Sequence, residues 1–260
     1  MENKKYTIDD LLEILKVLRG ENGCPWDRAQ THESIKKSMI EETYEAIDAL
    51  DSGDDHAFSN ELGDVLLQVA FHATLAKERG AFDFDDVVRE ICTKLITRHT
   101  HVFGEDKAVS AEEALGNWER NKKKEKNLKS DTELLNDVPH GLPALMRAQK
   151  VQKKAAACTE KPIDIKETAE KIKTLTDNVS ENSFASNEEL QAEYGKLLFE
   201  VSKLGQALKA DAETALAYST NKFIHIFAEA EEILKAESLT FADISPKKMD
   251  DLWKKAMQKS

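Results

Sequence analysis

The sequence predicts an all-α protein, and three observations support this prediction. Apolar residues recur three and four positions apart along most of the chain, which is the spacing of one helix face. No stretch shows the strict apolar–polar alternation of a half-buried β-strand. The 260 residues include only ten glycines and five prolines, fewer turn-forming residues than a β-sandwich or barrel needs. We therefore expect helices joined by short connections.

The first half of the chain divides into helices with recognisable ends. The stretch TIDDLLEILKVLRG begins with Thr7 as a helix-capping residue and stops at Gly20. The stretch ENGCPWDRAQTHES predicts a loop, because Gly23 and Pro25 interrupt it. Further elements follow in order along the chain: a helix at about 34–50, a turn at 51–59, and helices at 60–80, 83–99 and 110–126.

Four short words of the first half recur in the same order in the second half, which indicates an internal duplication. EETYEAI is echoed by KETAEKI at 166–172, and ELGDVLL by EYGKLLF at 193–199. KLITRHTHVF is answered by KFIHIFAEAE, and NWERNKKKE by LWKKAMQKS. We therefore expect a first helical module at 1–127, a linker segment at 128–150 and a second module at 151–260.

Composition narrows the classes of function. The formal net charge of −12 argues against a dedicated nucleic-acid binder, because a phosphate backbone requires a basic surface. Cys24, Cys92 and Cys158 are odd in number and lack metal-site spacing, so they read as free thiols. The first residues lack the apolar core of a signal peptide, and no run has the length of a membrane span. We expect a cytoplasmic protein without a membrane partner.

The most informative feature is a set of carboxylates on two consecutive helices. Glu41, Glu42 and Glu45 share about a third of one helix face, where like charges repel. Glu61 and Asp64 lie in a polar stripe along a second helix that is otherwise apolar and should be largely buried. An EExxE word alone usually marks a solvated face, and salt bridges to Lys or Arg would also satisfy the second pair. The combination favours a hard divalent cation with oxygen ligands, such as Mg²⁺.

The pattern E-E-x-x-E, fifteen residues, then E-x-x-D resembles the all-α nucleoside triphosphate pyrophosphohydrolases, the MazG family. GCPWDRAQTHESI, ELGDVLLQVAFHA, RHTHVFGE and VPHGLPALMRAQKVQKKAA match the family as well, so the similarity covers nearly the whole chain. The resemblance implies a helical dimer that uses Mg²⁺, or Mn²⁺ in its place, to convert nucleoside triphosphates into monophosphates and pyrophosphate. Thr100 departs from the family, which usually has proline there. The metal ligands that the resemblance implies are Glu42, Glu45, Glu61 and Asp64.

Other residues are candidates for the substrate and the water. Lys94 and Arg98 lie four apart on a helix and are natural partners of phosphate oxygens, although a plain basic surface turn would look the same. Trp118 and Lys122 would cover a bound nucleotide, or Trp118 would pack into the core. Glu41, beside the ligands, is the candidate to orient or deprotonate the attacking water.

The two repeats are not expected to be equal. Alignment of the two repeats keeps the same acid or base at four positions: Glu42 with Glu167, Glu45 with Glu170, Glu61 with Glu193, and Lys94 with Lys222. It replaces three others: Glu41 by Lys166, Asp64 by Lys196, and Arg98 by Ile226. An ammonium at Lys196 would pair with the carboxylates that a cation needs, so we expect only the first module to be active.

Assembly and two alternative functions complete the expectations. The apolar sides of the acidic helices are broader than one module can cover, which predicts a homodimer with a helix bundle around the sites. An enzyme specialised for dUTP or phosphoribosyl-ATP would carry the same acidic helices. A helical dimer whose chemistry has decayed, and which binds nucleotides or a partner protein, is the non-catalytic alternative.

Overall fold

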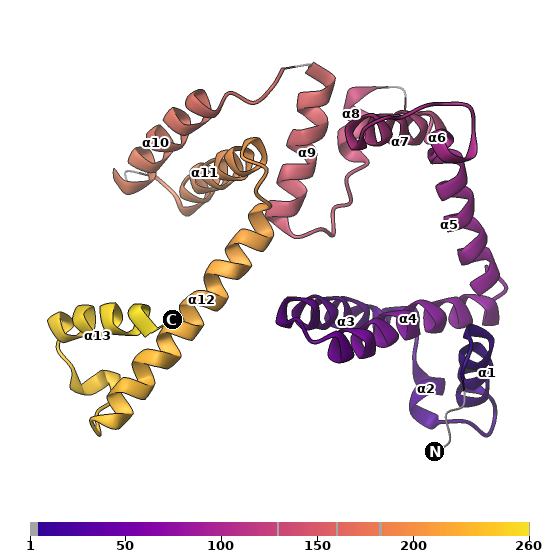
Figure 1. The fold of residues 1–260 in the computed structure, drawn as a ribbon, viewed down its shortest axis with the longest axis horizontal. Coiled ribbons are helices and arrows are strands. Elements are labelled where there is room, and N and C mark those ends of the chain that lie inside the picture. Colours follow the sequence, from indigo (N-terminus) through magenta and orange to yellow (C-terminus); the bar gives the residue numbers. More distant parts are fainter. Residues whose placement is uncertain (1–4, 129, 160, 182–183, 260) are drawn as a thin grey trace. The chain divides into compact units, whose positions relative to one another are not determined.

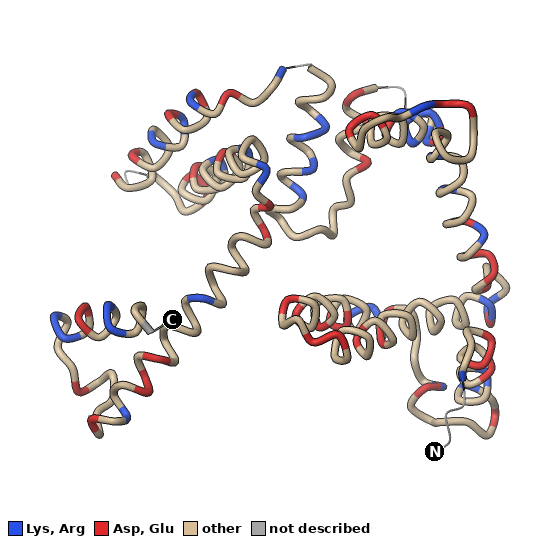
Figure 2. The backbone as a smooth tube through the Cα atoms, viewed as in Figure 1, with Lys and Arg blue, Asp and Glu red and all other residues tan. Residues whose placement is uncertain are grey.

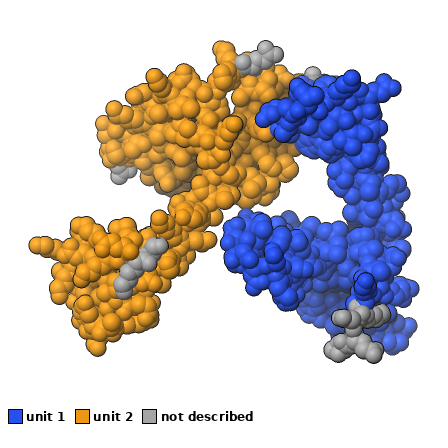
Figure 3. Space-filling view, viewed as in Figure 1, with its two compact units in different colours: residues 1–125 blue, residues 126–260 orange. Residues whose placement is uncertain are grey.

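The computed structural model describes residues 5–128, 130–159, 161–181 and 184–259. All regular secondary structure in these residues is helical, which confirms the all-α class (Figure 1). The chain divides into two compact units, unit 1 at Met1–Glu125 and unit 2 at Lys126–Ser260 (Figure 3). Within the described ranges, no helix combines the length and apolar character needed to cross a bilayer.

The elements follow one another without a strand between them in the described chain. The helices of unit 1 are α1 (Ile8–Arg19), α2 (Pro25–Ala29), α3 (His32–Ser52), α4 (Asp55–Glu78), α5 (Phe84–Arg98), α6 (Thr100–Phe103) and α7 (Ala111–Glu125). The helices of unit 2 are α8 (Asp131–Asn136), α9 (Ala144–Thr159), α10 (Ile165–Glu181), α11 (Asn187–Ala207), α12 (Ala212–Ala236), the short 3₁₀ helix η1 (Phe241–Asp243) and α13 (Pro246–Lys259).

Helix α1 begins and ends where the sequence predicts. The Thr7 hydroxyl accepts from the Asp10 N–H at 3.3 Å, and the Asp10 carboxylate accepts from the Thr7 N–H at 2.8 Å. This reciprocal pair is a capping box, which satisfies amide groups that have no partner inside the helix. Gly20 follows the last helical residue. Leu15 of α1 then packs with Phe71 of α4 in the core of unit 1.

Helices α3 and α4 form a tight antiparallel pair, side by side in Figure 1. Gly53 ends α3 in the left-handed region, with φ of +73°, which a residue with a side chain adopts only under strain. Asp54 caps α4 by accepting from the N–H groups of His56 at 2.9 Å and Ala57 at 3.0 Å. The connection is therefore shorter than the expected turn at 51–59, and it brings the two acidic stripes face to face.

Two expectations about unit 1 are wrong in part. The stretch expected to be a loop contains α2, whose first residue is Pro25. Proline suits the first helical position because its missing N–H would have no partner there. The expected burial of α4 holds for its second half, where Ala70 and Phe71 are buried, but Leu62 and Leu66 remain 47% and 43% exposed. The N-terminal half of α4 therefore has an apolar side that unit 1 leaves uncovered.

Helices α5, α6 and α7 pack against one another after α4. The Asp83 side chain caps α5 by accepting from the Asp86 N–H at 3.2 Å. Thr100, which stands where proline is usual, donates its hydroxyl to Asp106 at 2.5 Å and accepts from Asn121 of α7 at 2.8 Å. A proline would make neither contact, so Thr100 gives the α5–α6 junction a polar tie to α7.

Unit 2 begins earlier than expected. The expected linker segment at 128–150 contains α8 and the first part of α9, which pack together in unit 2. The buried Gln149 of α9 donates to the carbonyl oxygens of Ser202 at 3.0 Å and Ala210 at 2.9 Å, and accepts from the Ala212 N–H at 2.9 Å. These bonds fix α9 to the connection between α11 and α12, so this region is part of the fold.

Candidate metal centre

Three carboxylates converge where α3 and α4 face each other. Glu42, Glu45 and Glu61 each offer one oxygen, and these oxygens all lie within 4.8 Å of one another. Figure 2 shows acidic positions gathered at the end of the α3–α4 pair near its connecting turn. The short connection at Gly53 sets this register, because it places the middle of α3 opposite the start of α4. Three of the four expected ligands are therefore brought together.

Asp64, the fourth expected ligand, lies outside this trio but acts on it electrostatically. The pKa of Glu42 is raised above its ordinary value, first by partial burial and then by the negative charge of Asp64. Glu45, Glu61 and Glu41 raise the same pKa by smaller amounts. The carboxylates thus repel one another in the absence of a cation.

No described residue neutralises any of these side chains. No ion pair or side-chain hydrogen bond within the described residues involves Glu42, Glu45, Glu61 or Asp64. Unpaired carboxylates held this close favour binding of a cation, since its charge removes the repulsion. An all-oxygen donor set suits Mg²⁺ or Mn²⁺ and is unfavourable for softer metals that prefer sulfur or nitrogen. The residues present therefore fit a hard divalent cation.

Glu41 is placed differently from its neighbours. Its carboxylate forms an ion pair with Lys37, one turn earlier on α3, at 2.7 Å. The side chain is 49% exposed and is not one of the three converging groups. Glu41 therefore lies beside the candidate centre, on the solvent side of α3.

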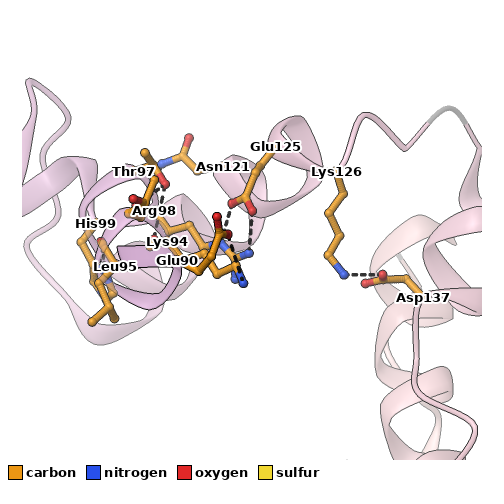
Figure 4. A network of polar contacts seen from close by, with 11 residues as sticks. Glu90, Lys94, Leu95, Thr97, Arg98, His99, Asn121, Glu125, Lys126 and Asp137 are labelled. Carbon is orange, nitrogen blue, oxygen red and sulfur yellow. Dashed lines mark hydrogen bonds and ion pairs between the residues drawn. The ribbon is translucent and has the colours of Figure 1, made fainter. Parts of the chain in front are cut away.

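The expected substrate-binding residues gather on α5 and α7. The Arg98 guanidinium, which is buried, donates to both carboxylate oxygens of Glu125 at 2.7 and 3.0 Å (Figure 4). Lys94, one turn earlier on α5, pairs with Glu90 at 3.9 Å. Arg98 thus already binds α7 to α5, whereas Lys94 is held by one long, half-exposed ion pair.

Trp118 of α7 has cationic groups near its ring. The Arg98 guanidinium carbon lies 5.2 Å from the centre of the indole ring, and the Lys122 ammonium lies 5.1 Å from it. Both distances are within the range of a cation–π contact. Figure 1 shows α7 beside the C-terminal half of α5, well away from the turn that joins α3 and α4. One chain therefore does not bring these four residues to the carboxylates.

A histidine pair on the same two helices was not anticipated. The Nδ1 atoms of His32 and His72 lie 2.8 Å apart and the rings are stacked, with an interplanar angle of 8°. Burial and then the proximity of His32 lower the pKa of His72. His72 lies on the polar side of α4, and the sequence gives no sign of its partner, since His32 starts the other helix. The pair closes the end of the α3–α4 contact opposite the turn.

In unit 2, the helix pair that the expected repeat aligns with α3 and α4 is α10 and α11, and its contacts are different. Lys196 donates to Glu193 at 2.7 Å, and Asn178 donates to the same carboxylate at 3.4 Å. These two contacts lower the pKa of Glu193, that from Lys196 first. Asn178 thus faces Glu193 across the pair, eight residues beyond Glu170. The alignment of Glu170 with Glu45 is therefore wrong in space, because eight residues of helix span about 12 Å.

The chain is similar to known proteins over different parts of its length. The model of the MazG nucleotide pyrophosphohydrolase domain matches residues 30–103, which include α3 and α4. The chain is 38% identical over 257 residues to the nucleoside triphosphate pyrophosphohydrolase/pyrophosphatase MazG of Thermotoga maritima, covering 98% of each chain. It is 39% identical over 250 residues to the nucleoside triphosphate pyrophosphohydrolase of Escherichia coli K12, covering 95% of each. The crystal structure of a mazG-related protein from Thermotoga maritima aligns with 44% of this chain and 98% of its own, at 27% identity and a TM-score of 0.39.

Proposed function

Since the chain belongs to the MazG family of nucleotide pyrophosphohydrolases, we propose that it hydrolyses nucleoside triphosphates to the monophosphate and pyrophosphate. The observation that carries the proposal is the convergence of unneutralised carboxylates from α3 and α4. A triphosphate and a bare acidic cluster repel each other, so a shared divalent cation is required between them. We assign its ligands to unit 1: Glu42, Glu45, Glu61 and Asp64.

The chemistry divides between the cation and the chain. When bound, Mg²⁺ would neutralise charge on the triphosphate and make a bound water more acidic. Glu41 is the proposed base, because its carboxylate lies next to the ligands and is not one of the converging groups. It would orient the attacking water and accept its proton, and the bond between the α- and β-phosphates would then break to release pyrophosphate.

Substrate binding in this proposal needs a second copy of the chain. Lys94, Arg98, Trp118 and Lys122 remain the proposed contacts to phosphate and base, and one chain holds them away from the carboxylates. A homodimer would also cover apolar side chains that are 39% exposed or more. Those on α3, α4 and α5 are Met39, Ile40, Tyr44, Ile47, Leu50, Leu62, Leu66, Val88, Ile91, Leu95 and Ile96.

The test is pyrophosphate release from a panel of nucleoside triphosphates, with and without Mg²⁺. The panel includes dUTP and phosphoribosyl-ATP, because an enzyme specialised for one of them would release pyrophosphate mainly from that substrate. Asp64→Asn is expected to remove the activity, and a chelator is expected to do the same to the wild type. Full release in excess chelator would contradict the assigned ligands.

A second readout separates loss of the site from loss of the fold. A cation that binds only the native state at a hundred times its dissociation constant stabilises it by about 2.7 kcal/mol. Mg²⁺ should therefore raise the unfolding temperature of the wild type, and Asp64→Asn should remove that rise while helical circular dichroism stays the same. A wild-type protein that folds, binds no Mg²⁺ or Mn²⁺ and releases no pyrophosphate would support the decayed, non-catalytic alternative.

A further inference from the structure

We propose that the α10–α11 pair of unit 2 is a self-neutralised counterpart of the α3–α4 pair. In it, lysine side chains of the chain itself take the place of a divalent cation. The protein then binds its catalytic cation in unit 1 alone. This inference rests on the proposed function for its assignment of unit 1, and its own content concerns unit 2.

The first support is the ion pair at the position that matches Asp64. Lys196 stands three residues after Glu193, as Asp64 stands three residues after Glu61. The Lys196 ammonium lies 2.7 Å from the Glu193 carboxylate, whose side chain is only 17% exposed. A carboxylate ligand is thus replaced by a cation that already pairs with the neighbouring carboxylate.

The second support is the register of the two helices. Asn178 meets Glu193, and Lys171 meets Glu200 at 2.5 Å, so both contacts place α10 and α11 in the same alignment. In that alignment Asn178 occupies the place that Glu45 has opposite Glu61. Glu170 precedes Lys171 and is eight residues before Asn178. It is therefore about 12 Å along the helix from the level of Glu193, too far for the two carboxylates to share a cation.

The third support is the balance of charge between the helices. Four carboxylates line the α3–α4 centre, with no basic partner among the described residues. Between α10 and α11, Glu200 is buried and contacts both Lys171 and Lys203, the latter at 3.6 Å. About 10 Å away along the pair, Glu193 has Lys196 as its partner, so the place that matches Glu61 and Asp64 carries no net charge. A divalent cation would gain little there, whereas the unneutralised carboxylates of unit 1 attract one.

The residues of unit 2 that align with Trp118 and its two cationic neighbours also lack the charges found in unit 1. Arg98 corresponds to Ile226, which is buried, and Lys122 corresponds to Met257. Trp253, which corresponds to Trp118, lies 5.5 Å from the ring of Phe223 and 6.0 Å from that of Phe227. The two cations near the first tryptophan are thus replaced by apolar groups and two aromatic rings. Unit 2 has lost groups suited to phosphate as well as those suited to metal.

The test is Mn²⁺ binding to the full chain, measured from the electron paramagnetic resonance signal of free Mn²⁺. Glu61→Gln and Glu193→Gln are matched variants, since each removes one charge at the corresponding place in its own unit. Glu61→Gln is expected to weaken Mn²⁺ binding at least tenfold, and Glu193→Gln is expected to leave affinity and stoichiometry unchanged. A loss of bound Mn²⁺ in Glu193→Gln would overturn the inference and leave the proposed function standing.

A variant designed to create a cation site between α10 and α11 tests the same inference. Lys196→Asp combined with Asn178→Glu would place three acidic side chains where the wild type has one, and it should increase the Mn²⁺ bound per chain. A folded double variant that binds no additional Mn²⁺ would overturn the inference. If the wild type itself bound no Mn²⁺ at millimolar concentration, the proposed function would fail. The inference about unit 2 would still be decided by whether the double variant binds more Mn²⁺ than the wild type. If the double variant does not fold, Glu193→Gln alone decides.

Discussion

Arg19 shows at the scale of one residue how unit 1 is held together. Its guanidinium donates to both oxygens of Glu78 at 2.6 and 2.7 Å and to the carbonyl oxygen of Asp27, and it lies 5.4 Å from the ring centre of Phe71. The Arg19 side chain is 8% exposed, whereas that of Glu78 is 45% exposed. One cation therefore connects the end of α1, the α2 segment and α4.

The pairing of Glu78 with Arg19 predicts a pH dependence of stability. The hydrogen bond and the charge of Arg19 lower the pKa of Glu78 below its ordinary value of 4.5. Ionised Glu78 therefore stabilises the fold above that ordinary value, and the contribution is lost as pH falls through the lowered pKa. Glu78→Gln should reduce the free energy of unfolding at neutral pH by about 1 kcal/mol, since the pair is half exposed.

The measurement is urea unfolding of wild type and Glu78→Gln over a pH series that extends well below 4.5. The two proteins should differ at neutral pH and converge on the acid side. Glu21→Gln is a suitable control, because it is the same substitution at an exposed position after α1, and the Glu21 side chain has no hydrogen-bond or ion-pair partner in the described chain. An equal loss in the control, or a difference that persists in acid, would contradict this reading of Arg19.

Single residues also show what the sequence reveals about the site and what it hides. The spacing of Glu42, Glu45 and Glu61 was enough to predict that they converge, because helix periodicity and a short turn fix their faces. The partner of His72 was hidden, because it lies forty positions away at the start of α3. The ion pair between Arg98 and Glu125 was not predicted for the same reason, because the two residues are distant in the sequence. Contacts between distant segments depend on packing, which periodicity does not encode.

At the scale of elements, helix ends with strong local chemistry are predictable and connections are less so. Thr7 and Gly20 mark α1 correctly because a capping residue and a terminal glycine act within one turn. The stretch 51–59 looks like a turn because it is rich in Asp, Ser and Gly, but Asp54 uses its side chain to start α4 almost at once. In the expected second repeat, 22 residues separate Glu170 from Glu193, where 15 separate Glu45 from Glu61. That insertion shifts the register of α10 against α11, and the alignment of short words does not detect it.

The uncovered apolar sides of α3 and α4 lead to a prediction about assembly. Ile47 and Leu66 are 45% and 43% exposed. Placing a lysine at both positions puts charge into the proposed dimer contact, where burial without a partner is unfavourable. Ile47→Lys with Leu66→Lys should therefore convert a dimer into a monomer with unchanged helical circular dichroism. Pyrophosphate release should fall as well, because the proposed substrate contacts come from the second copy.

Light scattering at micromolar concentration gives the oligomeric state. Val109→Lys is the matched control, since Val109 is 90% exposed in the segment before α7, outside α3, α4 and α5. The control should remain dimeric and active. A wild type that is a stable monomer, or a double variant that still dimerises, would show that these faces serve another purpose.

At the scale of the whole molecule, the chain contains two helical units, and a pair of facing helices in each carries a different balance of charge. In unit 1 the facing helices carry carboxylates that no basic side chain neutralises in the described residues. In unit 2 the facing helices carry Lys171, Lys196 and Lys203 against Glu193 and Glu200. This difference supports the proposal that the cation binds in unit 1.

The most direct test of this account is pyrophosphate release by two single variants, Glu61→Gln and Glu193→Gln. The two glutamates occupy matching places on α4 and α11, and each substitution removes one negative charge without changing shape. Glu61→Gln should reduce release by roughly 100-fold or more, because a proposed ligand is lost. Glu193→Gln should retain activity within about twofold, since its carboxylate pairs with Lys196 and belongs to no proposed site. Retained activity in Glu61→Gln together with its loss in Glu193→Gln would place the working site in unit 2 and contradict the central claim.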